Sequence, residues 1–211
     1  MKDLVIVGTG GFAREVHQIV EDLGSWNFLG FLDDNVANHG TRVHGQPVLG
    51  GVEWLNRHPE VHVSVGIGAT PAKARVVGRI HNPFATLIHP LAWVGNRVAI
   101  GEGSTLCAGV KVTTDIRIGR HVILNLDVTV GHDAVLHDYV TVAPSANISG
   151  NVEVGEGCDL GTNCTIIQGL GIGAWTIVGA GSVVVKALPP NVTAVGAPAR
   201  AIKERPEGWH K

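Results

Sequence analysis

The sequence predicts a mainly β protein, a parallel β-helix built from hexapeptide repeats and preceded by a small α/β domain. An aliphatic residue recurs at every sixth position in the second half of the chain, and the first 85 residues alternate between strand and helix patterns. Glycine supplies 29 of 211 residues, roughly twice its ordinary share. Because 45% of the chain is hydrophobic, this excess indicates a repeated tight turn and not disorder.

Residues 1–85 form the expected α/β domain, which is Rossmann-like in its pattern. Short apolar runs alternate with segments whose apolar residues recur at helical spacing. Such alternation is typical of a small parallel sheet covered by helices. In chain order we expect a strand at 4–7, a helix at 12–23, strands at 28–32 and 61–65, and a helix at 72–80.

Residues 86–187 form the expected β-helix. All seventeen positions taken at intervals of six from Ile88 to Val184 are Val, Ile or Leu, and glycine often follows them. Neither a helix nor a plain strand has a period of six. Three hexapeptides make a triangular coil, and coils stacked at about 4.8 Å form continuous apolar ladders. Residues 188–211 are expected to be a C-terminal tail that ends in a short helix.

Composition excludes several classes of function. The net charge of −2 and the lack of a basic run argue against nucleic-acid binding. No stretch approaches the roughly 20 apolar residues of a membrane span, and residues 4–7 are too short for an export signal. Three cysteines, an odd number, favour a reducing compartment, so we expect a cytoplasmic protein. Cys158 and Cys164 fall at inward positions and are interpreted as core residues.

Several motifs together resemble the bacterial nucleotide-sugar N-acetyltransferase and sialic acid O-acetyltransferase group of the left-handed β-helix acyltransferases. The resemblance rests on residues 7–12, 31–34, 87–90, 131–133 and 196–200. It implies a left-handed coil, whereas the general rule for parallel crossovers predicts the opposite hand. It also implies acetyl-CoA as the acetyl donor, and a homotrimer with active sites between adjacent subunits.

Within this resemblance His132 is the expected catalytic base. It follows a glycine corner, so its side chain should leave the coil, and Asp133 can fix its tautomer. An 18-residue coil places Gly150 one strand spacing away, where its N–H can receive an oxyanion. The alternatives are a solvated corner histidine and a simple turn glycine.

The resemblance also implies binding residues. Pro144, Thr162 and Ala180 form a column of slim residues at 18-residue intervals, although simple packing explains such a column equally well. The loop at residues 8–11 can present N–H groups to phosphates, but it is a weak dinucleotide motif. The implied acetyl-CoA contacts are Thr141, Thr162 and Ala180. Lys186 and Arg200 carry charges that can meet its phosphates, although solvated surface charges are the default interpretation of both. The implied nucleotide-sugar contacts are Gly10, Gly11, Phe12, Asp33, Asp34 and Gly68, with Asn125 near the reacting centre.

The predicted reaction is N-acetylation of a nucleotide-linked amino-deoxy sugar for surface-polysaccharide or glycan biosynthesis, without a bound metal. O-acetylation of a sialic-type sugar is the alternative within the group. His132 and His137 also have a spacing similar to that of trimeric β-helix carbonic anhydrases. That zinc site needs a third imidazole, for which His121 or His89 would have to serve across a subunit boundary. A non-catalytic scaffold is the third possibility.

Overall fold

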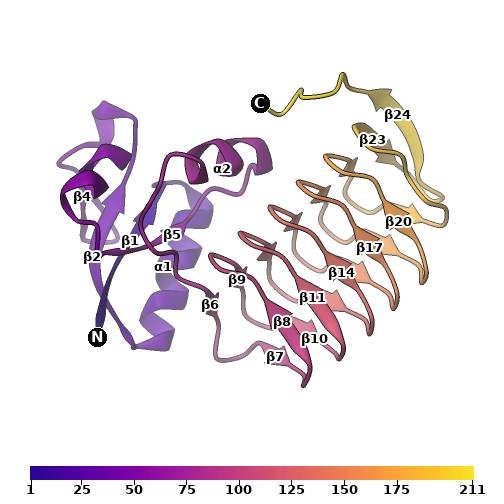
Figure 1. Ribbon diagram of the computed structural model, residues 1–211, viewed down its shortest axis with the longest axis horizontal. Helices are drawn as coiled ribbons and strands as arrows, with labels where there is room; N and C mark the ends of the chain where they lie inside the picture. Colours follow the sequence, from indigo (N-terminus) through magenta and orange to yellow (C-terminus); the bar gives the residue numbers. More distant parts are fainter. The chain divides into compact units, whose positions relative to one another are not determined.

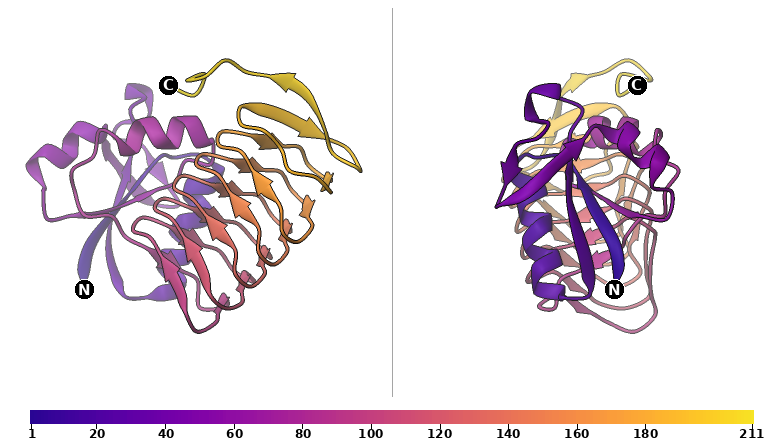
Figure 2. Two further views of the ribbon diagram at one scale, coloured as in Figure 1. Left: turned by 45° about the vertical axis from the view of Figure 1, so that its right-hand side comes forward. Right: turned by 90° about the vertical axis from the view of Figure 1, so that its left-hand side faces the viewer.

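The computed structural model describes all 211 residues and divides into two compact units, Met1–Pro90 and Leu91–Lys211. Figure 1 and Figure 2 show that the first unit combines a small sheet with helices, while the second is a stack of coils. No helix has the length and apolar content that crossing a bilayer requires.

The first unit is a five-stranded sheet with the strand order β3-β4-β2-β1-β5. Its core contains the apolar residues of β1, of the end of β2 and of one face of α1. All neighbouring strands pair in parallel except β3 and β4. The elements are β1 (Lys2–Val7), α1 (Gly11–Leu23), β2 (Trp26–Leu32), β3 (Arg42–Val43), β4 (Gln46–Gly50), β5 (His62–Val65), α2 (Thr70–Val77) and β6 (Leu87–Ile88), with 3-10 turns at Val36–Asn38 and Val52–Arg57.

The predicted strands and helices of this unit are all present, and α2 begins two residues before its predicted start. The β3–β4 hairpin was not predicted. Its turn places His44 and Gly45 at positive φ of 49° and 75°, as a tight two-residue hairpin requires. Within these two strands only Val48 is buried, so the hairpin lacks the alternating apolar pattern that reveals a strand in sequence.

The second unit is a β-helix with three parallel sheets, and successive strands of a sheet pair at a spacing of 18 residues, except for the last pair of the third sheet, where the spacing is 16. The first sheet contains β7 (Trp93–Val94), β10 (Lys111–Val112), β13 (Thr129–Val130), β16 (Asn147–Ile148), β19 (Thr165–Ile166) and β22 (Val183–Val184). The second contains β8 (Val98–Ile100), β11 (Ile116–Ile118), β14 (Val135–Leu136), β17 (Glu153–Val154) and β20 (Gly171–Ile172). The third contains β9 (Thr105–Leu106), β12 (Ile123–Leu124), β15 (Thr141–Val142), β18 (Asp159–Leu160), β21 (Ile177–Val178) and β23 (Val192–Val195).

Three corners join these sheets. The first corner follows the first sheet, as at residues 95–97, 113–115, 131–133 and 149–151. The second corner follows the second sheet, as at 101–103, 119–121, 137–139 and 155–157, and the third corner follows the third sheet, as at 125–127, 143–145, 161–163 and 179–181.

Glycine is frequent at these corners because the next coil approaches closely. A Cβ at Gly131 would lie 2.6 Å from the backbone nitrogen of Gly150, which is far inside van der Waals contact. Inside the coils, Leu106, Leu124 and Val142 are fully buried, as expected for continuous aliphatic ladders. The six-residue period therefore has two causes: the inward positions must be apolar, and many corner positions must lack a Cβ atom.

The prediction of a short helix at the end of the tail is wrong. Residues Arg200–Glu204 form strand β24, which pairs in an antiparallel manner with β23. The last parallel strand of a solenoid leaves a row of unpaired backbone groups, and an added antiparallel strand satisfies them.

Candidate active site

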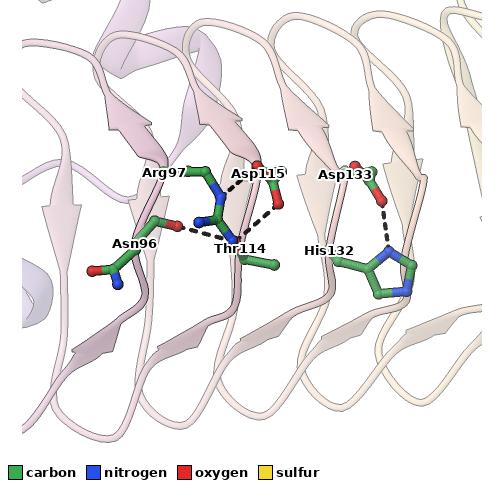
Figure 3. Close-up of polar contacts among 6 residues, drawn as sticks. All are labelled: Asn96, Arg97, Thr114, Asp115, His132 and Asp133. Carbon is green, nitrogen blue, oxygen red and sulfur yellow. Dashed lines mark hydrogen bonds and ion pairs between the residues drawn. The ribbon is translucent and has the colours of Figure 1, made fainter.

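The first corner has the same backbone turn in successive coils. Its third residue has positive φ each time: Arg97 (60°), Asp115 (58°), Asp133 (60°) and Asn151 (55°). Asp and Asn tolerate this left-handed conformation better than most residues. The preceding residues Asn96, Thr114, His132 and Gly150 thus repeat at the coil spacing along one edge, part of which is drawn in Figure 3.

His132 and Asp133 form a pair on this edge. The Nδ1 of His132 lies 2.7 Å from Oδ2 of Asp133, as Figure 3 shows. Both side chains are mostly exposed, at 66% and 59%. A carboxylate accepts a hydrogen bond but cannot donate one when ionised, so this contact assigns the proton of neutral imidazole to Nδ1. Nε2 then carries the lone pair and can accept a proton.

Gly150 lies directly beside the imidazole. A Cβ at Gly150 would be 2.7 Å from both Cε1 and Nε2 of His132, so the ring packs over the bare backbone of the next coil. The N–H of Gly150 donates no hydrogen bond within the chain. The structure therefore brings together the three residues predicted for catalysis, and it adds an available backbone donor next to the lone pair.

The residues predicted to contact acetyl-CoA, and Asn125, which was predicted near the reacting centre, lie elsewhere on the coil. Thr162, Ala180 and Asn125 belong to the third corner, and Thr141 lies on β15 in the third sheet, where it is buried. A strand of the first sheet separates the third corner from the first corner in every coil. A single chain therefore does not bring these residues to His132.

The predicted nucleotide contacts lie at the carboxyl ends of β1, β2 and β5. Because parallel strands end at one edge of the sheet, the loops that follow them meet there. A Cβ at Gly10, Gly11 or Gly68 would meet no atom within 4 Å, so the backbone at these three positions is open to a ligand. Phe12, in the first turn of α1, is partly exposed at the same edge.

Asp33 is the centre of a polar cluster at this edge. Thr9 donates to its Oδ2, Asn38 Nδ2 donates to Oδ2 at 3.0 Å, and the Asn35 N–H donates to Oδ1 at 2.9 Å. Burial favours the neutral acid, but these hydrogen bonds outweigh it and lower the pKa of Asp33 below its usual value. Sequence reasoning missed Thr9 and Asn38, whose only signal was their position in the two loops.

Asp34 has a different role. It pairs with Arg79 and accepts from the Val52 N–H at 3.0 Å, and the Arg79 hydrogen bond lowers the pKa of its carboxyl group. These contacts tie the end of β2 to two other segments of the first unit. Arg79 was not singled out in the sequence, because a partner 45 residues away is visible only in the fold.

The remaining candidates have ordinary surroundings. Burial raises the pKa of Cys158 to about 12 and that of Cys164 to about 11, so neither thiol ionises near neutral pH. His137 lies at the second corner, where its Nε2 is 2.7 Å from Oε1 of Glu153. His132 and His137 thus lie at different corners of the chain, although a metal site would need them together.

Comparison with known proteins identifies relatives of both units. Residues 3–80 match the family described as PglD N-terminal domain. UDP-N-acetylbacillosamine N-acetyltransferase of Bacillus subtilis (strain 168) is 36% identical over 113 residues, which are 51% of this chain and 52% of that relative. The aligned segment therefore spans about half the length of this curated relative.

Several solved structures match nearly the whole chain, and two of them show the range of relatives. Perosamine N-acetyltransferase from Caulobacter crescentus, in a variant complexed with CoA and GDP-perosamine, is 33% identical, with 97% of this chain and 98% of that chain covered and a TM-score of 0.89. The acetyltransferase domain of PglB from Neisseria gonorrhoeae FA1090, complexed with acetyl coenzyme A, is 30% identical, with 95% and 99% covered and a TM-score of 0.88. The predicted fold, a left-handed parallel β-helix after a small α/β domain, is confirmed.

Proposed function

The chain belongs to the nucleotide-sugar N-acetyltransferases of the hexapeptide-repeat class, and we propose that it transfers acetyl from acetyl-CoA to the amine of a nucleotide-linked amino sugar. One observation carries the proposal: the His132–Asp133 pair, with a contact of 2.7 Å, lies on an exposed edge beside the free N–H of Gly150. The perosamine and PglB enzymes, solved with CoA and acetyl-CoA, support the choice of donor. The product would enter bacterial surface-polysaccharide or glycan assembly.

In the proposed reaction the sugar amine attacks the thioester carbonyl while Nε2 of His132 removes its proton. Asp133 stabilises the resulting imidazolium, and the Gly150 N–H donates to the oxyanion of the tetrahedral intermediate. The carbon–sulfur bond then breaks, and His132 returns the proton to the departing thiolate. Acetyl passes directly to nitrogen, so the enzyme forms no acyl intermediate.

We further propose a homotrimer whose active sites lie between subunits. The supporting observation is that Thr162 and Ala180 lie at the third corner, whereas His132 lies at the first. A closed cyclic assembly repeats one interface, so each first corner can face a neighbour's third corner. Acetyl-CoA would then contact Thr141, Thr162 and Ala180 of one chain and react at His132 of another. Lys186 and Arg200 are the proposed partners of its phosphates.

The first unit is the proposed holder of the nucleotide. Gly10, Gly11 and Gly68 leave open backbone for phosphates, and Asp33 stays ionised at neutral pH because hydrogen bonds lower its pKa. An ionised carboxylate at this edge can accept hydrogen bonds from ribose hydroxyls. Phe12 and Asp34 complete the proposed lining, and Asn125 is proposed near the reacting centre.

The experiment is a thiol-release assay with acetyl-CoA and a panel of acceptors. The panel contains UDP-, dTDP- and GDP-linked 3-amino and 4-amino sugars and free sialic acid. Rapid thiol release with one nucleotide-linked amino sugar is the expected result, and it identifies the nucleotide. Thiol release with sialic acid alone would contradict N-acetylation. No thiol release with any acceptor, together with no binding of acetyl-CoA, would favour a non-catalytic scaffold.

A further inference from the structure

Arg97 on the first corner has a side chain that is 69% exposed and bonded to the neighbouring coil. Its Nε donates to Oδ1 of Asp115 at 2.9 Å, and its Nη2 donates to Oγ1 of Thr114 at 3.0 Å. Figure 3 shows the guanidinium lying against this neighbouring coil. Oγ1 of Thr114 is itself 2.9 Å from Oδ2 of Asp115, so the two acceptors also fix each other.

These contacts use only one edge of the guanidinium. Nε and one N–H of Nη2 are engaged, and Nη1 has no hydrogen bond within the chain. The remaining fork, formed by Nη1 and the second N–H of Nη2, is therefore available to an acceptor. A planar fork with fixed orientation suits two oxygens of one phosphate group.

The open fork of Arg97 lies along the same corner as the imidazole of His132. The guanidinium lies against the coil of Thr114, and the imidazole lies over Gly150, two coils further along the same edge. Two strand spacings are about 10 Å. One sugar ring, with a hydrogen bond at each end, spans a distance of this order.

We propose that Arg97 binds the phosphate that is directly attached to the sugar of the nucleotide-sugar substrate. The inference rests on the proposed function, because it takes His132 as the base that meets the amine. With the thioester oxygen at Gly150, the sugar extends from His132 toward the coils of Thr114 and Arg97. The phosphate at the far end of the sugar then reaches the open fork.

The chain contains a matched ion pair that lacks this position. Arg120 and Asp138 are also 18 residues apart, with side chains 61% and 29% exposed, and Nε and Nη2 of Arg120 donate to Oδ2 of Asp138 at 3.0 and 2.9 Å. This pair lies at the second corner. A pair whose purpose is only to tie two coils together would behave alike at either corner.

The test compares Arg97→Met with Arg120→Met in steady-state kinetics. We expect Arg97→Met to raise the KM for the nucleotide sugar about 10- to 100-fold, as for loss of a hydrogen bond to a charged group, while the KM for acetyl-CoA stays unchanged. Arg120→Met should leave both KM values unchanged. A rise in the KM for acetyl-CoA instead would assign the fork to a CoA phosphate and overturn the proposal. Equal losses of thermal stability with unchanged KM values in both variants would also overturn it.

A binding measurement separates this inference from the proposed reaction. Calorimetry with UDP, dTDP and GDP, and with their monophosphates, needs no acetyl transfer. Arg97→Met should weaken binding of the preferred diphosphate by about the same factor and leave its monophosphate unaffected, because only the diphosphate contains the sugar-linked phosphate. Equal weakening of both nucleotides, or of neither, would contradict the role of Arg97 even if acetyl transfer is confirmed.

Discussion

The first and second corners of the β-helix share one turn conformation and carry different side chains. At the first corner Asp133 has a φ of 60°, and at the second Tyr139 has a φ of 62°. In both places an imidazole covers a glycine of an adjacent coil: His132 lies over Gly150, and His121 lies over Gly103.

The two histidines differ in what surrounds them. His121 is 5% exposed and stacks on the ring of Tyr139 at 5.4 Å between centroids, with an angle of 10° between planes. The side chain of His132 is 66% exposed and meets only a carboxylate and a bare backbone. The solenoid thus supplies the same spacing at every corner, while the neighbouring side chains determine whether a histidine ring is buried in packing or exposed at the surface.

Substitution of His132 should reduce turnover more than any other change while leaving the fold intact. His132→Asn removes the proposed base, so kcat should fall by about 100- to 10,000-fold while the melting temperature stays within about 1 °C. The matched change His121→Asn should lower the melting temperature and leave kcat of the folded protein near wild type. Thiol release and thermal melting measure the two effects. Near-wild-type kcat in His132→Asn would contradict the proposed role of His132 in the reaction.

Gly150→Ala should produce the next effect. The added Cβ would lie 2.7 Å from the imidazole, so the ring must move away from the proposed oxyanion donor. We expect kcat to fall about 10- to 100-fold, since misplacement by about 1 Å has costs of this order. Gly171→Ala is the control, because a Cβ there meets no atom within 4 Å. A similar loss in both variants would show that coil rigidity, and not the position of His132, is responsible.

Gly157→Ala tests the packing side of the comparison. Gly157 has a φ of 65°, and its Cβ would collide with the ring of Trp175, which stacks on His210 at 3.6 Å. Overpacking and left-handed strain together should reduce the free energy of unfolding by about 2–4 kcal/mol, measured by chemical denaturation. An unchanged denaturation midpoint would mean that the aromatic stack adapts freely.

A third histidine, His17, is buried and should make the stability of the protein depend on pH. His17 is 1% exposed and packs against Phe28 at 4.5 Å between ring centroids, and burial lowers its pKa despite nearby Glu21. The unfolded chain, with a histidine pKa of about 6.5, then binds a proton before the folded chain does. Stability should therefore be full above about pH 6.5 and fall below it, by at most about 1.4 kcal/mol per pH unit from this group.

The variant His17→Leu should lose this part of the pH dependence. Denaturation of wild type and variant at several pH values between about 5 and 8 measures the difference, since this range brackets the unfolded pKa. Parallel stability curves for the two proteins would show that His17 does not titrate in this range.

The smallest effect concerns the thiols. Because burial raises the pKa of Cys158 to about 12 and that of Cys164 to about 11, neither thiol should react with iodoacetamide in the folded protein at neutral pH. Mass spectrometry should find both alkylated only after denaturation. Rapid labelling of either residue in the native protein would place it outside the core.

Sequence reasoning succeeded where one rule repeats along the chain. The period of six determines which residues point inward, and the period of 18 is by itself enough to place Gly150 beside His132. Prediction from sequence failed for segments that do not follow a repeat. The hairpin from Arg42 to Gly50 buries too little apolar surface to show a strand pattern, and β24 forms because the last coil leaves an unpaired edge.

In the candidate site, too, some residue positions follow from the repeat and some contacts are visible only in the fold. The positions of His132 and Asp133 follow from the repeat, whereas the contacts of Asp33 with Thr9 and of Asp34 with Arg79 join residues distant in the chain. Sequence spacing also indicates that Thr162 lies at another corner than His132, because their separation of 30 residues is not a multiple of 18. That separation supports a site completed by a neighbouring subunit.

The most direct test of the central claim is the chemical nature of the acetylated product. Labelled acetyl-CoA and the preferred nucleotide-linked amino sugar are incubated with wild type and with His132→Asn, and the isolated product is treated with mild hydroxylamine. We predict that wild type places the label in a hydroxylamine-resistant amide and that the variant forms almost none. Label lost to hydroxylamine would reveal an ester, and equal labelling by both proteins would show that His132 is not the base.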